Sequence, residues 1–564
     1  MDKKYIEISD LKDMLNKTKE VYADRPAYKI RIKENEYRII THKEIREMID
    51  ALGTALMNLG LKGKRIAVIG ENRYEWGLSY LSVVCGVGTV VPLDKSLPEN
   101  ELEELVRRSE VEAIFYSKKY DEAVKKIKFS DKNKLKHLIS MDLEEHSEGV
   151  YSQLQLIEKG KKLIENGNRD FIDVKINPEE MNIMLFTSGT TSKSKVVALS
   201  HKNICSNLMA FAPELKIDEN DRVLSFLPIH HVFECTAGFL YSLYVGSQTS
   251  FCDGIKHIVE NLNEYKITFA CFVPAIYESL YKNIVRKLEK DGKLELIRKL
   301  EEEYKDASIE EKKKVFKGIH DIFGGEIKLL ISGAAALDKD VACAFRKWGI
   351  VLCQGYGLTE TSPVVAIETL DEFKPGSIGK ALPNVQVKLE DVDANGMGEL
   401  VVKGPNVMLG YFGNEEATKE VLKDGWFYTG DLAKIDEDGY IFICGRKKSV
   451  IVLKNGKNIF PEEMENLVNK IEGVKESFIF GKQQSNDKED VKINVKIVFD
   501  RNIIRDTYKV ESDDEIYEVI SNKIKEINKI MPKYKSIKGI ILTEEPLIKT
   551  TTNKIKRQEN MKYL

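Results

Sequence analysis

The stretch "GKRIAVIGENRYEWGLSYLSVVCGVGTVVPL", residues 63–93, decides the fold class. A β-branched run is followed by a turn, an apolar helix and a second β-branched run, which is the pattern of a βα unit. The pattern repeats at "ENELEELVRRS" (99–109) and "VEAIFYS" (111–117). Further short buried strands are predicted at "ITFACFVP" (267–274) and "IKLLISGAA" (327–335). Strands that alternate with helices indicate a parallel sheet covered by helices, so we expect an α/β protein.

The residues from 376 onward show a different sequence pattern. From residue 376, short strands broken by glycine ("GSIGKALPNVQVKLEDVDANGMGELVVKGPNVMLGYFG") predict an antiparallel sheet or a small, distorted β-barrel. At "GYIFICGRKKS" (439–449) a strand ends in a cationic turn, and beyond it helices such as "PEEMENLVNKI" mix with strands such as "VKINVKIVF". A chain of 564 residues exceeds what one hydrophobic core usually supports. We therefore predict a large N-terminal domain and a small C-terminal α+β domain.

Composition and charge narrow the function classes. The chain is 42% hydrophobic and 31% charged, and its formal net charge of −3 gives no general attraction to nucleic acid or anionic membranes. No apolar run is long enough to span a bilayer, and the start "MDKKYIEISDLKDML" lacks the apolar core of a signal peptide. The eight cysteines are scattered without metal-ligand spacing, which disfavours a zinc site. We expect a cytoplasmic protein without a nucleic-acid partner, and loose peripheral contact with a membrane stays compatible with the sequence.

Residues 281–320 are dense in charge, with glutamate and lysine three and four positions apart. This spacing is typical of solvated helices that carry one apolar stripe. Plain insertion helices are the favoured interpretation, and a regulatory or docking role is the alternative.

The stretch "LFTSGTTSKSKVVALSH" (185–201) lies between an apolar run and a segment that we expect to be helical. Its hydroxyl groups, backbone N–H groups and lysines offer many donors with little bulk, which suits the phosphates of a nucleotide. The second glycine and the GK[ST] ending of a P-loop are missing. A serine- and threonine-rich surface loop is the alternative. The candidate phosphate-binding residues are Thr187, Ser188, Gly189, Thr190, Thr191 and Lys195.

Two further segments carry candidate nucleotide ligands. In "VLCQGYGLTETSPV" (351–364), Tyr356 is placed to stack on a purine, and Glu360 is a hard oxygen ligand that suits Mg²⁺. A tyrosine in a tight turn beside a solvated glutamate is the alternative there. In "DGWFYTGDLAKIDEDGYIFICGRKKS" (424–449), Asp431 follows a Thr-Gly turn and Arg446 ends a strand. A carboxylate there suits ribose hydroxyls, and a guanidinium suits phosphate or ribose oxygens.

The fourth segment is "PLIKTTTNKIKRQ" (546–558), which by itself is typical of a solvated basic patch. Together, in order and spacing, the four segments resemble the adenylate-forming superfamily of acyl-CoA synthetases, firefly luciferase and peptide-synthetase adenylation domains. The resemblance extends from about residue 25 to the C-terminus and rests on "YGLTE", "GWFYTGD" and "GRKKSVIVLKNGKNIFPEEME". The insertion at 281–320 and "PIHHVFE" (228–234) are most similar to the long-chain fatty-acid branch.

The resemblance implies an ATP-dependent fatty-acid–CoA ligase. Such enzymes join a carboxylic acid to ATP, release pyrophosphate, and pass the acyl group from acyl-AMP to a thiol. ATP, Mg²⁺, coenzyme A and a fatty acid are the ligands it implies. Two alternatives remain: an acyl-AMP ligase or acyl-carrier-protein synthetase that uses a protein-bound thiol, and a non-catalytic lipid- or nucleotide-binding homologue.

The resemblance also assigns residues. It implies a large domain over 1–445, a hinge over 446–449 with Lys448 as its pivot, and a small mobile domain over 450–564. Thr187 and Glu360 would hold Mg²⁺, and the catalytic residues would be Lys554, Glu360, Arg446 and His231. Besides the 187–195 loop, the ATP-binding residues would be Ser332, Gly333, Ala334, Gln354, Gly355, Tyr356, Gly357, Thr359, Asp431, Arg446 and Lys448. The acyl and CoA channel would be lined by His231, Phe233, Val273, Asn455 and Gly456.

Lys554 matches the adenylation lysine of the superfamily. A carboxylate that attacks a phosphate brings two anions together, and a lysine between them neutralises charge that builds in the transition state. For the neighbouring His230 and His231, a satisfied strand-end pair is the alternative, and a metal role is disfavoured. Ser192, Ser194 and Asn553 depart from the usual family residues, and "SGAAALD" has alanine where glycine is frequent. Because the charged residues remain, we expect slower or retuned catalysis at most.

Overall fold

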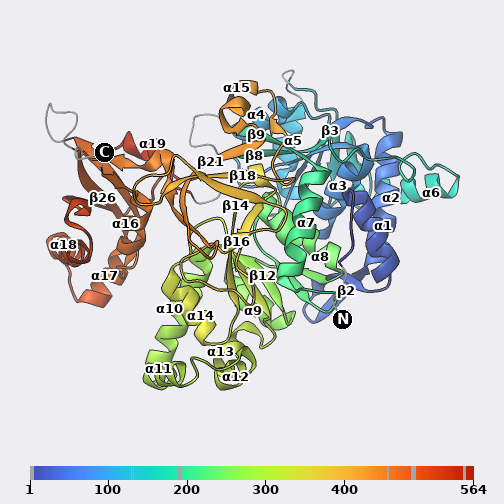
Figure 1. The fold of residues 1–564 in the computed structure, drawn as a ribbon. Helices are drawn as coiled ribbons and strands as arrows, with labels where there is room; N and C mark the ends of the chain where they lie inside the picture. The colour runs from blue at the N-terminus through green and yellow to red at the C-terminus, as the bar shows by residue number, and fades with distance from the viewer. Residues whose placement is uncertain are drawn as a thin grey trace.

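A computed structural model describes residues 5–128, 130, 133–187, 194–453, 457–483, 491–550 and 554–564 (Figure 1). Within these residues, two large mixed sheets form the body of the protein. The first contains, in spatial order, β16 (Lys380–Ala381), β15 (Val364–Ile367), β14 (Leu352–Gly357), β13 (Leu329–Ser332), β12 (Phe269–Phe272), β10 (Arg222–Ser225), β11 (Gln248–Phe251), β1 (Pro26–Lys33) and β2 (Glu36–Thr41). The second contains β19 (Gly410–Tyr411), β9 (Lys195–Ser200), β8 (Met181–Thr187), β4 (Gly88–Pro92), β3 (Lys64–Ile69), β5 (Ala113–Tyr116), β6 (His137–Ser140) and β7 (Val150–Ser152).

The central strands of both sheets are parallel, as the βα pattern predicts. In the second sheet β3 pairs in parallel with β4 and β5, and in the first sheet β12 pairs in parallel with β10 and β13. Antiparallel pairs occur toward the edges, such as β1 with β2 and β8 with β9. The α/β fold class is therefore confirmed.

Helices cover these sheets. They are α1 (Leu11–Tyr22), α2 (His42–Asn58), α3 (Tyr74–Ser82), α4 (Glu99–Ser109), α5 (Asp121–Lys128), α6 (Gln153–Glu165), α7 (His201–Leu215), α8 (Tyr241–Val245), α9 (Ile258–Glu264), α10 (Pro274–Lys290), α11 (Leu294–Glu303), α12 (Ile309–Val315), α13 (Lys317–His320), α14 (Lys339–Lys347) and α15 (Glu415–Val421). Two π-helical turns, Val83–Val87 and Phe233–Leu240, extend this set. The charged insertion is helical, as predicted, and α10 to α14 project from one end of the body (Figure 1).

The segment from residue 376 forms an antiparallel sheet, as predicted. Its strands are β17 (Gln386–Glu390), β18 (Gly398–Lys403), β21 (Trp426–Ile435) and β20 (Leu422–Lys423), with β22 (Ile441–Arg446) paired to β21. A 3₁₀ turn, Lys447–Ser449, leads from β22 into the C-terminal residues.

The C-terminal residues form a compact α+β unit beside the body (Figure 1). Its elements are β23 (Ile451–Val452), β24 (Asn458–Ile459), α16 (Pro461–Val468), β25 (Val474–Gln483), β26 (Val491–Phe499), α17 (Arg501–Tyr508), α18 (Asp513–Ile530), β27 (Gly539–Thr543) and α19 (Arg557–Met561). The unit has a hydrophobic core of its own, in which Met464, Ile497 and Ile520 are fully buried. Burial of this separate core allows the unit to keep its structure independently of how it contacts the body.

One expectation from the sequence is wrong. The serine- and threonine-rich stretch does not join a strand to a helix, because Lys195–Ser200 forms β9, antiparallel to β8, and α7 begins only at His201. The run Val-Val-Ala-Leu inside this segment has β propensity and is buried in the sheet, which explains the second strand. Ser200 caps α7, with its side chain accepting from the N–H of Asn203.

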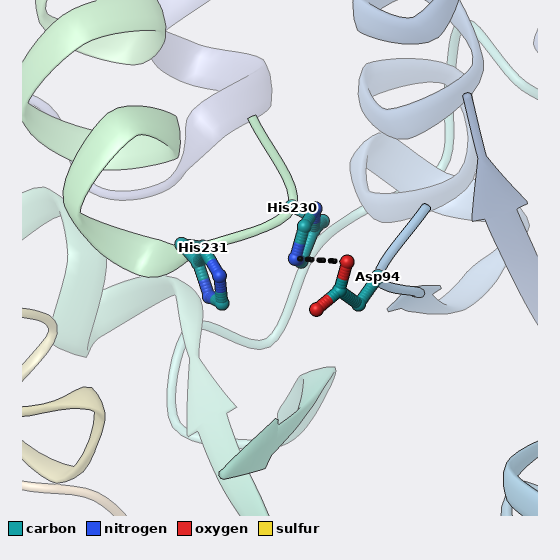
Figure 2. A group of neighbouring side chains, drawn as sticks. All are labelled: Asp94, His230 and His231. Carbon is teal, nitrogen blue, oxygen red and sulfur yellow. Dashed lines mark ion pairs between the residues drawn. The ribbon is translucent and has the colours of Figure 1, made fainter. Parts of the chain in front are cut away.

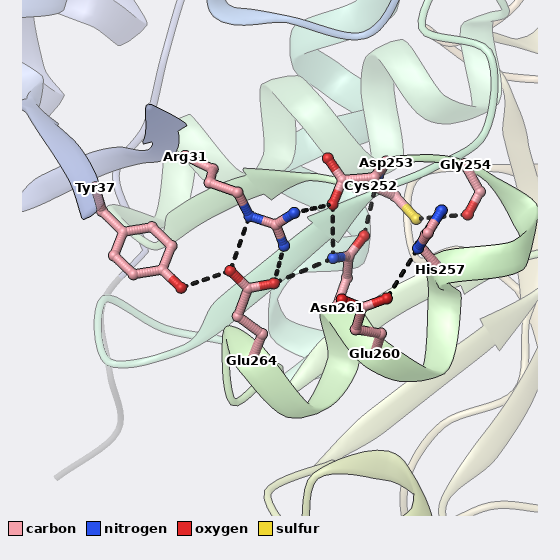
Figure 3. A network of polar contacts seen from close by, with 9 residues as sticks. All are labelled: Arg31, Tyr37, Cys252, Asp253, Gly254, His257, Glu260, Asn261 and Glu264. Carbon is pink, nitrogen blue, oxygen red and sulfur yellow. Dashed lines mark hydrogen bonds and ion pairs between the residues drawn. The ribbon is translucent and has the colours of Figure 1, made fainter. Parts of the chain in front are cut away.

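A polar network joins the β1–β2 hairpin to the rest of the body (Figure 3). Arg31 donates from Nε to Glu264 of α9 at 3.0 Å, and its other nitrogens contact Glu264 and Asp253. The Tyr37 hydroxyl donates to the same Glu264 carboxylate. One register pair, Tyr28 with Thr249, aligns β1 with β11, and this network adds polar contacts to the buried core residues of the hairpin such as Tyr28 and Ile40. Its groups satisfy one another, which indicates a structural role.

Candidate active site

Tyr356, Asp431 and Arg446 come from three different strands and meet at one place. The Tyr356 hydroxyl of β14 donates to Asp431 Oδ2 at 2.6 Å, and Arg446 Nε lies 2.7 Å from Asp431 Oδ1. Asp431 and Arg446 are register partners on β21 and β22, which fixes their approach. Burial raises the pKa of Asp431, and the guanidinium of Arg446 opposes that rise. The structure thus brings together three residues that the sequence assigned to one nucleotide.

The Thr-Gly-Asp segment, expected to be a turn, lies inside β21 at an irregularity in its pairing with β18, and it holds this carboxylate locally. Thr429 donates its hydroxyl to the carbonyl of Leu400 at 2.7 Å and accepts from the N–H of Asp431 at 3.0 Å. Gly430 has a φ of +72°, in the left-handed region that favours glycine. This irregularity of the strand therefore orients Asp431 through backbone geometry as well as through its two side-chain partners.

Glu360 is oriented by a tyrosine that the sequence analysis missed. Tyr411 of β19 donates its hydroxyl to Glu360 Oε1 at 2.9 Å. The ring of the same tyrosine lies under the Lys195 ammonium, 4.2 Å from the ring centroid. Lys195 is the register partner of Thr187, at the end of the β8–β9 pair where residues 188–194 connect the two strands. Tyr411 therefore connects the predicted metal ligands Thr187 and Glu360 with the predicted phosphate-binding lysine.

We call Tyr356, Glu360, Tyr411, Asp431 and Arg446 the carboxylate corner. Its polar groups pair with one another, and Arg446 acts electrostatically on Tyr411 as well as on Asp431. Thr359 begins the 3₁₀ turn that carries Glu360. A Cβ at Gly357 would lie 1.8 Å from the carbonyl oxygen of Pro363, so only glycine allows the close β14–β15 approach here.

The segment after β13 lines the site on another side. Ser332 is buried, and none of the described residues hydrogen-bonds its hydroxyl. A Cβ at Gly333 would lie 2.8 Å from the ring of Phe233, so the glycine lets that ring pack against the backbone. Ala334 has a φ of +72°. Val273, also predicted at the site, follows β12 and begins α10.

Gln354 of β14 is held by hydrogen bonds from both its side chain and its backbone. Its amide oxygen accepts from the N–H of Leu337 at 3.2 Å, and its Nε2 donates to the carbonyl of Ser377 at 2.9 Å. Its own N–H donates to Glu368 Oε2 at 2.9 Å. Burial raises the pKa of Glu368 to about 7. The sequence analysis did not find Glu368, because its role depends on the β14–β15 pairing. Gly355 lies on the same strand with ordinary space around it.

A second group consists of Asp94, His230 and His231 (Figure 2), and together with Glu234, which follows them in the chain, we call it the histidine corner. His230 Nε2 lies 3.5 Å from Asp94 Oδ1, and the two histidine rings are 4.1 Å apart. Burial, helped by the neighbouring His230 and by Lys554, lowers the pKa of His231 to about 3. The His231 imidazole is therefore neutral at physiological pH.

Glu234 is fully buried in the π-helical turn that follows the histidines. Burial raises its pKa to about 8, so the carboxyl is mostly protonated at neutral pH. The Ser225 hydroxyl donates to its Oε1 at 2.6 Å. Asn72 donates to the same Ser225 hydroxyl and to the carbonyl of Leu227, and thereby holds the loop that leads to the histidines. Glu234 was missed because a lone glutamate in "HHVFE" gives no sign of full burial.

Lys554 comes from the C-terminal unit and lies close enough to both corners to act on their charged groups. It interacts electrostatically with Arg446, Asp431 and Glu360 in one corner and with His231 in the other. The protein around its ammonium group, followed by the charge of Arg446, lowers its pKa below the ordinary value, although part of the side chain stays accessible to solvent. The turn that carries it is closed by the N–H of Thr550, which donates to the Lys554 carbonyl at 2.8 Å.

Charge pairs connect the C-terminal unit to the body. Lys470 lies 2.7 Å from Asp338 and 2.9 Å from Asp340, and Arg286 pairs with Glu472. These side chains are partly exposed.

The remaining predicted residues fall into two groups. Lys448 lies exposed in the 3₁₀ turn between β22 and β23. The predictions for the other group stay untested because these residues lie outside the described part of the chain: Ser188, Gly189, Thr190, Thr191, Ser192, Asn455, Gly456 and Asn553.

Comparison with known proteins gives a family and a set of relatives. The model of a family described as AMP-binding enzyme matches residues 15–412, and one described as AMP-binding enzyme C-terminal domain matches residues 448–563. Fatty acyl-CoA synthetase B of Dictyostelium discoideum is 28% identical over 85% of this chain and 76% of that protein. Long chain acyl-CoA synthetase 3 of Arabidopsis thaliana is 29% identical over 80% and 72% of the two chains. A long-chain-fatty-acid–CoA ligase of Escherichia coli is 28% identical over 86% and 85%.

Solved structures with the same fold extend over nearly the whole chain. An anthranilate CoA ligase in complex with anthranoyl-AMP superposes with a TM-score of 0.77 at 19% identity and covers 98% of this chain and 97% of its own. ATP-bound MatB from Rhodopseudomonas palustris gives a TM-score of 0.75 at 22% identity, with 98% and 99% coverage. At this identity the likeness shows the fold alone. In the described residues, every helix is too short or too polar to cross a membrane.

Proposed function

The chain belongs to the AMP-binding enzyme family, and on that premise we propose that it is a long-chain fatty-acid–CoA ligase. The observation that carries the proposal is the position of Lys554, whose charge acts on Asp431, Glu360 and His231 together. A cation there lies between a nucleotide bound in the carboxylate corner and a fatty acid that enters past His231. The names of the acyl-CoA synthetase relatives support the choice of substrate.

In the first half-reaction, the fatty-acid carboxylate attacks the α-phosphorus of ATP. A carboxyl oxygen–phosphorus bond forms, the bond to the β-phosphate oxygen breaks, and pyrophosphate leaves. Lys554 neutralises the negative charge that builds as the two anions meet, and such a preorganised contact is worth about 10²–10³ in rate. Because the carboxylate is already ionised, no general base is required.

The carboxylate corner would hold the nucleotide. Asp431 accepts the ribose hydroxyls, Arg446 contacts ribose or phosphate oxygens, and Tyr356 stacks on adenine, with Ser332 and Ala334 on the opposite side. The Tyr356 hydroxyl bond to Asp431 keeps the ring and the carboxylate in fixed relation before the nucleotide arrives.

The residues near Tyr411 fit a magnesium ion bound together with ATP. Thr187 and Glu360 are hard oxygen donors, and Mg²⁺ is usually held by one or two such side chains and the substrate phosphates. Bound there, the ion would neutralise phosphate charge. Tyr411 orients the Glu360 carboxylate toward this role, and Lys195 adds a second positive charge on the same side.

In the second half-reaction, the thiol of coenzyme A attacks the acyl carbon. A carbon–sulfur bond forms, the bond to AMP breaks, and the thiol proton passes to solvent. Lys554 must leave before the thiol can arrive, so we propose that the domain from residue 450 rotates about the hinge 446–449, centred on Lys448. The separate core of this domain and the exposed charge pairs that join it to residues 1–445 suit such a movement. We propose a cytoplasmic location because all eight cysteines are free.

Product analysis by mass spectrometry tests this function. The purified protein receives Mg-ATP and carboxylic acids of graded chain length, with and without coenzyme A. We expect long-chain acyl-CoA and AMP to appear together. Acyl-AMP that accumulates and ignores coenzyme A would instead indicate a carrier-protein thiol. Absence of AMP with every acid would contradict the ligase.

A further inference from the structure

The histidine corner contains a set of side chains that could ligate a metal, a role in which the proposed ligase reaction does not use them. Asp94 follows β4, whereas His230 and His231 lie in the loop after β10 (Figure 2). One ligand atom from each of the three side chains lies within 4.8 Å of the others, and among the described residues this is the one such group of three. The sequence disfavoured a metal because only the fold brings Asp94 to the histidine pair.

The spacing is close to that of a tetrahedral zinc site. Bonds of about 2.0–2.1 Å from zinc to nitrogen and oxygen place tetrahedral ligand atoms about 3.3 Å apart. The separation of 3.5 Å between His230 Nε2 and Asp94 Oδ1 already has this length. The widest separation, 4.8 Å at most, requires a side-chain rotation that shortens it by about 1.5 Å.

The two imidazoles also have unsatisfied atoms. The Nε2 atoms of His230 and His231 are both buried, and no group in the described residues hydrogen-bonds either of them. A buried nitrogen without a partner costs free energy, and two such nitrogens that face one carboxylate favour a ligand that binds all three. Two imidazoles and one carboxylate form a donor set typical of zinc sites, and Mg²⁺ prefers oxygen ligands.

We propose that Asp94, His230 and His231 bind one Zn²⁺ ion reversibly, at a site distinct from the magnesium ligands Thr187 and Glu360. With three protein ligands, the fourth coordination position stays open to water. The ion would lie beside the entry of the fatty acid and add positive charge near Lys554, whose charge already reaches His231. Because the ion lies beside that entry, zinc inhibits adenylation by competing with the fatty acid. This inhibition rests on the proposed function, whereas zinc binding itself does not.

Competition with a chromogenic zinc chelator measures binding directly, on untagged protein without ATP or fatty acid. We expect one equivalent of zinc to bind the wild type. His230→Phe keeps the ring shape and removes the ligand, and Asp94→Asn keeps the shape and removes the charge. We expect each to weaken binding by at least about tenfold, the smallest loss usual for a group that supports a metal site. Circular dichroism in the presence of a chelator checks that each variant is folded.

His257→Ala is the matched control, since His257 pairs with Glu260 at 2.8 Å on the surface and the described part of the chain offers them no third metal ligand (Figure 3). We expect it to bind zinc like the wild type. Equal affinity of the wild type, His230→Phe and Asp94→Asn would overturn the site, because the zinc would then be bound elsewhere, for example by cysteines.

A second arm follows AMP formation while zinc and fatty acid are varied. We expect zinc to raise the apparent KM for the fatty acid in the wild type, and to do so at least tenfold less effectively in His230→Phe. If zinc binds with the expected variant pattern but no acid is activated, the proposed function fails and the site stands. If acids are activated but zinc does not bind, the site fails and the function stands.

Discussion

The carboxylate corner and the histidine corner both lie near Lys554, yet they differ in how far their polar groups are paired with one another. In the first, Tyr356, Asp431 and Arg446 pair with one another, and Glu360 has its own donor in Tyr411. In the second, the two histidine Nε2 atoms and Glu234 Oε2 are buried, and no described residue hydrogen-bonds them. A preorganised set of charges suits a ligand whose charge is constant, such as ATP. Groups without charge at neutral pH, such as the His231 imidazole and the Glu234 carboxyl, suit a boundary that an apolar chain must pass.

Lys554 lies between the corners, and its removal is expected to have the largest effect. In Lys554→Ala, we expect pyrophosphate release from fatty acid and ATP to fall by about 10²–10³. Transfer from supplied acyl-AMP to coenzyme A should stay close to the wild-type rate, because the small domain has then moved the lysine away. Separate assays of the two half-reactions measure this. Equal loss in both would contradict the two-orientation mechanism.

Glu234→Gln tests whether the buried Glu234 carboxyl is uncharged in the folded protein. The raised pKa means that the folded protein keeps the proton up to about pH 8, whereas the unfolded chain releases it near its ordinary value of 4.5. Between these values the folded state binds more protons, so wild-type stability falls as pH rises and levels off above about pH 8.

Glutamine does not titrate, so we expect the stability difference between wild type and Glu234→Gln to change by a few kcal/mol across this window. Denaturant unfolding at several pH values measures it. The exposed Glu415→Gln is the control, expected to follow the wild type. A difference that stays constant from pH 5 to 8 would mean that Glu234 is charged in the fold.

Asp431→Asn probes the opposite property, the need for charge in the carboxylate corner. The change leaves Arg446 without its anionic partner and weakens acceptance of the ribose hydroxyls. Because a hydrogen bond to a charged group contributes about 1.5–3 kcal/mol, we expect KM for ATP to rise about tenfold to a hundredfold. Steady-state kinetics measures it, with Asp436→Asn, whose partner is Lys374, as the control in the same sheet. Unchanged KM would remove Asp431 from the nucleotide site.

Tyr411→Phe removes one hydroxyl and leaves the ring under Lys195. Glu360 then loses its donor, and we expect the Mg²⁺ concentration for half-maximal adenylation to rise about tenfold. Tyr428→Phe is the control, since that ring contacts Lys423 away from Glu360. A magnesium dependence identical to that of the wild type would show that Glu360 needs no orientation by Tyr411.

The smallest effect is expected where the small domain meets the large one. Lys470→Ala removes partly exposed charge pairs with Asp338 and Asp340 that are worth about 1 kcal/mol or less. We expect the ratio of adenylation to thioester formation to fall about threefold or less, and the effect to vanish at high salt. Lys475→Ala, which breaks a pair with Asp500 inside the small domain, is the control. A rise in the ratio of adenylation to thioester formation would contradict the view that these charge pairs stabilise the orientation in which adenylation occurs.

The sequence by itself determined the fold class and most of the carboxylate corner. Hydrophobic periodicity indicates parallel strands because a buried strand and an amphipathic helix need different spacings of apolar residues. Four residues of that corner each lie in a short, recognisable segment: Tyr356, Glu360, Asp431 and Arg446. Part of the geometry of such a segment comes from hydrogen bonds between its own residues, as between Thr429 and Asp431.

Tertiary structure alone decided the rest. Tyr411 reaches Glu360 because β19 adds to the edge of β9, Asp94 reaches His230 because β4 and β10 end near one place, and Glu234 is neutral because the body encloses it. The strand that was missed at the end of the serine- and threonine-rich stretch has the same origin, since pairing with β8 made Lys195–Ser200 a strand. Contact between distant segments and the burial of a charge are properties of the packed chain, and no local pattern of residues encodes them.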